Sequence, residues 1–152
     1  MTNIVNYKKT HQNEINAMMQ EIALEFEEQI LPKTTKETPK IPDTYWVAIH
    51  NKKVIGTVGV LVVENQYGIL KKMMLKKEFR GKKLGVSKKM LTKVIRWSEE
   101  NGILKIYLGT MSQFKAAHSF YKNNGFMPIK ESELPHDFLK NPLDTVFFVK
   151  TF

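Results

Sequence analysis

The chain of 152 residues contains no cysteine. Disulfides, thiolate metal sites and a cysteine nucleophile are therefore excluded, and a cytoplasmic location is the simplest expectation. The four histidines are His11, His50, His118 and His136, and their spacing is not typical of metal ligands. We therefore expect no metal site.

Long apolar runs are also missing. No stretch of about 18 apolar residues occurs, so we expect no membrane-spanning segment. Residues 1–9 lack the apolar core of a secretion signal. Hydrophobic residues make up 42% of the chain and charged residues 26%, as in ordinary globular proteins. The length fits one domain, residues 1–152, with a core of its own.

Arginine is scarce, although the formal net charge is +9. Only Arg80 and Arg96 are arginines, so lysine carries almost all of the positive charge. A basic nucleic-acid-binding module is therefore one alternative. However, an A+T-rich genome also enriches lysine, and the basic residues do not form one tract with interleaved aromatics. The densest run, 71–89, coincides with a motif described below.

Apolar periodicity predicts an α+β domain with a single mixed, mostly antiparallel sheet flanked by helices. A helix after a Thr10 N-cap is expected to bury apolar residues from Ile15 to Ile30, and a loop follows over 31–43. The second helix should bury Leu84, Met90 and the apolar residues after them. Strands are expected over 4–7, 45–50, 54–63, 67–75, 103–109, 126–130 and 145–150, and helices over 84–100 and 113–123.

Residues 70–86 read as a strand, a basic turn with two glycines, and the start of a helix. The first N–H groups of a helix have no intrahelical partner, and the helix dipole adds positive charge there. Glycines let a phosphate approach the main chain, and Arg80, Lys82 and Lys83 add full charges. The spacing fits neither a Walker loop nor a dinucleotide-binding fingerprint. The segment therefore predicts a site for another diphosphate.

The same segment resembles the coenzyme A diphosphate loop of the Gcn5-related N-acetyltransferases (GNAT family), Arg/Gln-x-x-Gly-x-Gly/Ala, from Arg80 to Gly85. A second segment, 113–126, resembles the family's Ala-x-x-Phe-Tyr-(x)3-Gly-Phe pattern. Ala117, Tyr121 and Phe126 are among the positions in register. The resemblance covers about residues 54–150.

The resemblance implies the GNAT fold, in which the strands at 67–75 and 103–109 splay apart around the pantetheine arm. It implies an N-acetyltransferase that transfers the acetyl group of acetyl-CoA to a primary amine by direct attack in a ternary complex. The main-chain N–H of Met73 would stabilise the oxyanion, Leu75 would pair with pantetheine, and Tyr121 would protonate the leaving thiolate. The coenzyme-binding residues would be Met73, Met74, Leu75, Arg80, Gly81, Lys82, Lys83, Leu84, Gly85, Val86, Ser87, Gln113, Phe114, Ala117 and Tyr121.

Three positions depart from the family pattern. Lys83 replaces the middle glycine of the loop, and Ile69 stands where histone-type relatives have a glutamate base. Phe114 replaces a frequent asparagine, with Gln113 beside it as a substitute. No side chain is identified as the base, and proton removal through ordered water is preferred to Glu64 or Glu78.

The partner expected from these patterns is a small-molecule or peptide amine, and neither a membrane nor a nucleic acid. The alternative hypothesis is a basic nucleic-acid-binding module that resembles the family in fold but is not catalytic. A homodimer is compatible with the sequence. His118, one turn before Tyr121, is expected to be exposed. Asp144 belongs to a Pro-x-x-Asp-Thr-x-Phe ending that resembles some small bacterial acetyltransferases, and we interpret it as structural.

Overall fold

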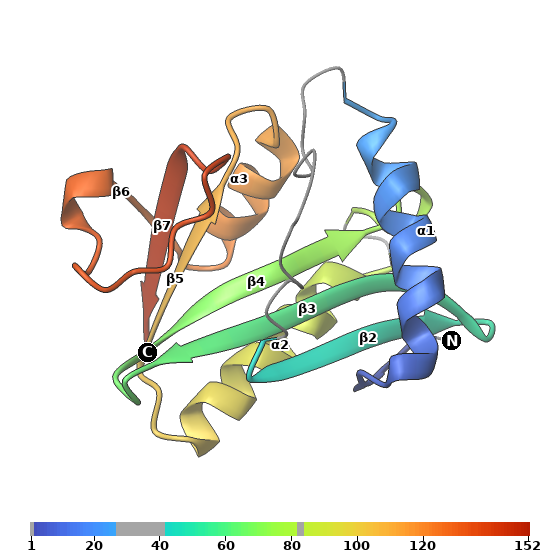
Figure 1. Ribbon diagram of the computed structural model, residues 1–152, viewed down its shortest axis with the longest axis horizontal. Helices are drawn as coiled ribbons and strands as arrows, with labels where there is room; N and C mark the ends of the chain where they lie inside the picture. The colour runs from blue at the N-terminus through green and yellow to red at the C-terminus, as the bar shows by residue number, and fades with distance from the viewer. Residues whose placement is uncertain (1, 27–41, 82–83) are drawn as a thin grey trace. The chain divides into compact units, whose positions relative to one another are not determined.

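The computed structural model describes residues 2–26, 42–81 and 84–152 (Figure 1). Within these residues, seven strands form one mixed sheet in the order β1-β2-β3-β4-β5-β7-β6. This confirms the predicted fold class. The strands are β1 Thr2–Asn6, β2 Thr44–His50, β3 Lys53–Val63, β4 Tyr67–Leu75, β5 Lys105–Thr110, β6 Met127–Ile129 and β7 Val146–Thr151. The helices are α1 Gln12–Ala23, α2 Val86–Glu100 and α3 Lys115–Asn123, with short 3-10 turns η1 Lys9–His11, η2 Lys77–Phe79 and η3 Glu131–Glu133.

The chain forms two compact units. The first comprises Met1–Val60 and Lys71–Trp97, and the second comprises Leu61–Leu70 and Ser98–Phe152. β4 contributes its first half to the second unit and its second half to the first. In the second unit, β4 and β5 pair in parallel at Gly68–Ile106 and Ile69–Tyr107, as strand–helix–strand connectivity predicts.

The first unit holds its helices on the strands β2 and β3. The main-chain N–H of Val54 donates to Glu14 Oε2 of α1 at 3.0 Å. Trp46 of β2 meets Trp97 of α2 edge to face, with ring centroids 6.2 Å apart. Gly56 of β3 leaves the room that the side chains of Leu75 and Met90 occupy, since an added Cβ would lie 3.0 and 3.4 Å from them.

The second unit uses both faces of the β5–β7 pair. Gly109 pairs with Phe147 and Leu108 pairs with Phe148, so these two pairs project to opposite faces. Phe148 lies under α3, with its ring 5.8 Å from that of Tyr121. Phe147 lies on the other face with Phe138, whose ring is 6.2 Å away. Phe138 comes from the segment between β6 and β7, so that segment and α3 cover opposite faces.

The first helix is shorter than the periodicity predicts. It ends at Ala23, and Phe26 lies beyond it. Thr10 lies in η1 instead of capping the helix, whose N-cap is His11. After Ala23 the hydrogen bonds join residues three positions apart, as in a 3-10 turn. The Phe26 N–H, for example, donates to Ala23 O at 3.3 Å. Ile30 and nearly all of the expected loop 31–43 lie outside the described residues.

Leu84 is not part of the buried face of α2. It precedes the helix, which begins at Val86, and is 49% exposed. The buried face starts instead with Val86 and continues through Met90, Leu91 and Val94. The expected helical start was therefore two residues too early, because Gly85 has a left-handed φ of +64° that a helix cannot include.

Candidate active site

The second half of β4 is irregular at the residue that precedes Met73. Lys72 has a φ of +53°, which is uncommon for a residue with a side chain. The buried Thr57 hydroxyl donates to Lys72 O at 2.6 Å. In a trans peptide the carbonyl and the following N–H point in opposite directions. The Met73 N–H therefore points away from Thr57. The left-handed conformation of Lys72 thus turns this main-chain donor away from Thr57 of β3.

Lys72 adds an electrostatic feature to the same place. Burial lowers the pKa of its ammonium group, because desolvation penalises the charged form. The sequence did not single out this residue, since a lysine within a strand usually indicates only a solvent-facing position. No sequence pattern predicts that a lysine within a strand will adopt a left-handed conformation.

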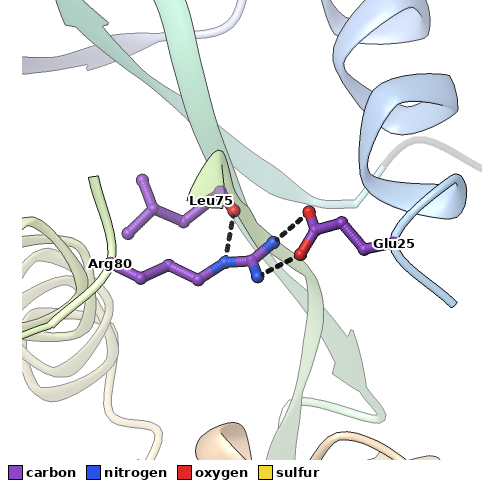
Figure 2. A network of polar contacts seen from close by, with 3 residues as sticks. All are labelled: Glu25, Leu75 and Arg80. Atoms are coloured by element: carbon purple, nitrogen blue, oxygen red, sulfur yellow. Dashed lines mark hydrogen bonds and ion pairs between the residues drawn. The ribbon is translucent and has the colours of Figure 1, made fainter. Parts of the chain in front are cut away.

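Arg80 is held by two partners within the first unit (Figure 2). Its Nε donates to Leu75 O at 2.8 Å. Its Nη1 and Nη2 donate to the two carboxylate oxygens of Glu25 at 2.6 and 2.9 Å. Arg80 thus ties the end of β4 to the residues that follow α1, and its charge is matched by Glu25. Sequence reasoning missed Glu25, which lies 55 positions away.

We expect Glu25→Gln to lower the free energy of unfolding by about 0.5–1 kcal/mol, measured by urea denaturation. The bidentate geometry favours the pair, but both side chains are partly exposed, which limits the gain. Glu21→Gln is the matched control, because Glu21 meets Lys76 through one contact at 3.6 Å and is 53% exposed. Equal costs for the two substitutions would contradict a specific role for the Arg80 contact.

In the turn after Arg80, the main chain is accessible at the two glycines. Gly81 has a φ of +102° and Gly85 one of +64°, and no heavy atom lies within 4 Å of where either Cβ would be. Gly85 O accepts the Lys89 N–H at 3.0 Å, so it starts the hydrogen-bond ladder of α2. The N–H groups of Val86, Ser87 and the next residue therefore begin the helix. This arrangement can bind an anion. Lys82 and Lys83 lie outside the described residues.

Tyr121 is buried in the second unit. It is 6% exposed, and its ring lies 5.5 Å from that of Phe126 and 5.8 Å from that of Phe148. A glycine in the left-handed conformation follows the end of α3: Gly125 has a φ of +89°, and Phe126 N–H bonds Tyr121 O at 3.0 Å. Burial, and after it the charge of Asp144, raises the pKa of Tyr121 above its usual 10.0. The hydroxyl is therefore protonated at neutral pH and is a weaker acid than that of an exposed tyrosine.

The start of α3 differs in detail from the prediction. Gln113 and Phe114 precede the helix, and Phe114 is its N-cap residue. Gln113 Nε2 lies 3.5 Å from Met111 Sδ. His118 is half-buried, not exposed as expected, because its Nε2 lies 3.0 Å from Met111 O and its ring packs near that of Phe148. Ala117 is half-buried on the same helix.

The predicted site residues fall into two groups. Met73, Met74 and Leu75 lie on β4 and are joined to the turn of 80–87 through the bond from Arg80 to Leu75. The group from Gln113 to Tyr121 lies in the second unit. Across the described residues, no cluster of three or more acidic or histidine side chains could hold a metal ion. None of the helices described in 2–26, 42–81 and 84–152 is both long and apolar enough to cross a bilayer.

Comparison with known proteins matches residues 15–126 to the acetyltransferase (GNAT) family. The chain is 32% identical over 108 residues to N-acetylaspartate synthetase of Danio rerio, covering 68% of this chain and 37% of that protein. It therefore spans little more than a third of the length of this curated relative.

Solved structures agree with the family match. A GNAT-family acetyltransferase from Staphylococcus aureus Mu50 superimposes with a TM-score of 0.86 and 31% identity over 99% of both chains. A GNAT-family acetyltransferase from Elizabethkingia anophelis, crystallised with acetyl-CoA, shares the fold at a TM-score of 0.61 and 12% identity, over 99% of this chain and 98% of that one. No comparison supports a nucleic-acid-binding module. The chain belongs to the GNAT family of acetyltransferases.

Proposed function

We propose that this protein is an acetyl-CoA-dependent N-acetyltransferase that acetylates a primary amine in a ternary complex, with both compact units acting as one acetyltransferase domain. The observation that carries the proposal is the open glycine turn at the start of α2. The space around Gly81 and Gly85 is open, so the coenzyme diphosphate can approach the main chain there and bind its N–H groups. The family match and the relative with bound acetyl-CoA support the same coenzyme.

The contacts of Arg80 indicate which groups of the loop bind the coenzyme and which fix the shape of the loop. Because its guanidinium is engaged by Leu75 O and Glu25, its first role is to fix the turn at the end of β4. The phosphate oxygens then bind to main-chain N–H groups from Gly81 to Ser87, and Lys82 and Lys83 add long-range attraction.

The acyl group is activated by the main chain of β4. The Met73 N–H donates to the thioester oxygen, and its orientation away from Thr57 supports this role. An oxyanion donor held by a strained backbone needs no reorganisation when charge develops. Leu75 would pair with pantetheine, although its carbonyl already accepts one bond from Arg80. Gln113, Phe114 and Ala117 would line the coenzyme near Tyr121.

The reaction then requires two proton transfers. The acceptor reacts as the neutral amine: its lone pair forms a bond to the carbonyl carbon, and the nitrogen loses one proton to ordered water as this bond forms. The carbon–sulfur bond breaks, and Tyr121 donates its proton to the departing thiolate. The Tyr121 hydroxyl is protonated at neutral pH, as this role requires, although burial raises its pKa and so makes it a weaker acid. The acceptor is a small-molecule or peptide amine, and the cysteine-free sequence supports a cytoplasmic location.

Calorimetry tests the proposal directly. We expect acetyl-CoA and CoA to bind with micromolar Kd, which corresponds to about −8 kcal/mol. S-acetylpantetheine is the matched control, since it keeps the thioester but lacks the diphosphate, and we expect it to bind at least about 10²-fold more weakly. Absence of binding by acetyl-CoA and CoA at about millimolar concentration would reject the proposed function.

A further inference from the structure

Thr57 is a buried polar side chain in the middle of an apolar strand. It is 1% exposed, and the other buried residues of β3 are glycine or aliphatic. Valine would fill nearly the same volume without the cost of removing a hydroxyl from water. A buried hydroxyl therefore needs a hydrogen-bond partner, and the identity of that partner indicates what the hydroxyl does.

The partner is the carbonyl of the one irregular residue of β4. The Thr57 hydroxyl donates to Lys72 O at 2.6 Å, and Lys72 has a φ of +53°. This conformation is unfavourable for a residue with a side chain, so other contacts have to maintain it. A peptide unit is planar and turns as a whole. The bond that holds Lys72 O therefore also sets the direction of the Met73 N–H.

Tyr45 of β2 extends the hydrogen bonding by one step. Thr57 is paired with Val47, which projects to the same face of β2 as Tyr45. The Tyr45 hydroxyl is hydrogen-bonded to the Thr57 side chain, and burial raises the pKa of Tyr45, so this hydroxyl is protonated at neutral pH. Because Thr57 gives its only hydroxyl proton to Lys72 O, its oxygen accepts the proton of Tyr45.

Tyr45 is itself held in place within the first unit. It is 9% exposed, and its ring stacks on that of Tyr7 with the centroids 4.9 Å apart. The Tyr7 N–H donates to Tyr45 O at 2.9 Å. The Tyr7 hydroxyl donates to Gln12 Oε1 of α1 at 2.6 Å, so it is not used by the hydrogen bonds of Tyr45 and Thr57. The two hydroxyls of Tyr45 and Thr57 thus form a fixed relay that ends at the Lys72 carbonyl.

We propose that Thr57, supported by Tyr45, is a positioning residue that directs the Met73 N–H toward the thioester oxygen and strengthens it as a donor. The inference rests on the proposed function, because it requires the thioester to lie against Met73. Hydrogen bonds in a chain polarise one another, and a peptide whose carbonyl accepts a bond has a more positive N–H. Both hydroxyls act through the peptide that joins Lys72 to Met73, so the donor is already oriented when charge develops on the oxygen.

Infrared difference spectroscopy of bound acetyl-CoA, labelled with ¹³C at the thioester carbonyl, tests the inference without an acceptor. A hydrogen bond from Met73 lowers the carbonyl stretching frequency relative to free acetyl-CoA. Thr57→Val keeps the side-chain shape and removes the hydroxyl. It should lose at least about half of this shift and slow acetyl-CoA hydrolysis about tenfold or more, since a misdirected oxyanion donor loses much of its effect. The Kd for acetyl-CoA should stay within about threefold, because the diphosphate contacts are unchanged.

Three further variants separate this role from packing. Thr57→Ser retains the hydroxyl and should retain the frequency shift. Tyr45→Phe removes the first donor of the relay but keeps the ring on Tyr7, so it should lose a smaller part of the shift. Tyr7→Phe is its matched control, because the Tyr7 hydroxyl bonds to Gln12 outside the relay, and it should behave as the wild-type protein.

An unchanged shift in folded Thr57→Val would overturn the inference, and so would the absence of any shift in the wild-type protein. Should Thr57→Val fail to fold, Tyr45→Phe decides: a shift equal to that of Tyr7→Phe would overturn the relay, and a reduced shift would support it. Failure of the wild-type protein to bind acetyl-CoA would overturn the proposed function as well. Intact coenzyme binding with an unchanged shift in Thr57→Val would overturn only the positioning role.

Discussion

Tyr121→Phe is expected to lower the turnover of acetyl transfer about 10²-fold or more, in line with the usual size of general acid catalysis. The substitution deletes only the hydroxyl and keeps the ring between Phe126 and Phe148. The Kd for acetyl-CoA should change little, because the hydroxyl acts when negative charge develops on sulfur. Thiol release from acetyl-CoA measures turnover with any amine acceptor, and slow hydrolysis of acetyl-CoA serves until an acceptor is identified.

Tyr107→Phe is the control for the loss of a buried hydroxyl. Tyr107 lies on β5 and is 9% exposed, but its ring contacts Tyr67 and Phe138 and not α3. It should keep wild-type turnover. Full activity of Tyr121→Phe would reduce Tyr121 to a packing residue and leave water or the acceptor to protonate the thiolate.

Gly85→Asp is expected to weaken acetyl-CoA binding by at least about 2 kcal/mol, measured by calorimetry. The new carboxylate would lie where the diphosphate should bind and would repel it. It would also compete for the free N–H groups at the start of α2. The left-handed φ of +64° adds a cost to folding of about 1–2 kcal/mol, but nothing lies within 4 Å of the new Cβ, so the fold should survive.

Two controls separate charge from backbone strain. Gly85→Ala carries the same left-handed strain at the same position without the charge. Gly102→Asp adds the same side chain at a φ of +72° in open space, beyond the opposite end of α2. Both should bind acetyl-CoA nearly as well as the wild-type protein. An unchanged Kd in folded Gly85→Asp would mean that the phosphates bind elsewhere.

The sequence by itself determined the elements and the family. The strands are mostly short runs with β-branched residues bounded by turn residues. This local signal survives folding because the central strands of the sheet bury at least one face. The loop from Arg80 to Gly85 and the segment from Ala117 to Phe126 identified the coenzyme chemistry. Sequence reasoning can recognise these motifs because glycine is strongly favoured where the main chain adopts a left-handed conformation, as at Gly85 and Gly125.

Helix ends were less predictable than helix centres. The apolar period past Ala23 continues through Phe26, yet α1 stops and Leu24 is 88% exposed. Periodicity records which residues could share a face, but the packing of neighbouring segments decides how far the helix runs.

Only the tertiary structure decided which distant residues meet. Glu25 accepts hydrogen bonds from Arg80, and the Thr57 hydroxyl donates to Lys72 O. The Asp144 carboxylate lies against Gly109. Each contact joins residues that are 15 or more positions apart, so no local pattern could encode it. The predicted exposure of His118 was also wrong, because the path of the chain between β5 and α3 places its partner Met111 O beside the ring. Propensity and motif act over a few residues, whereas burial and electrostatic environment depend on what the folded chain brings alongside.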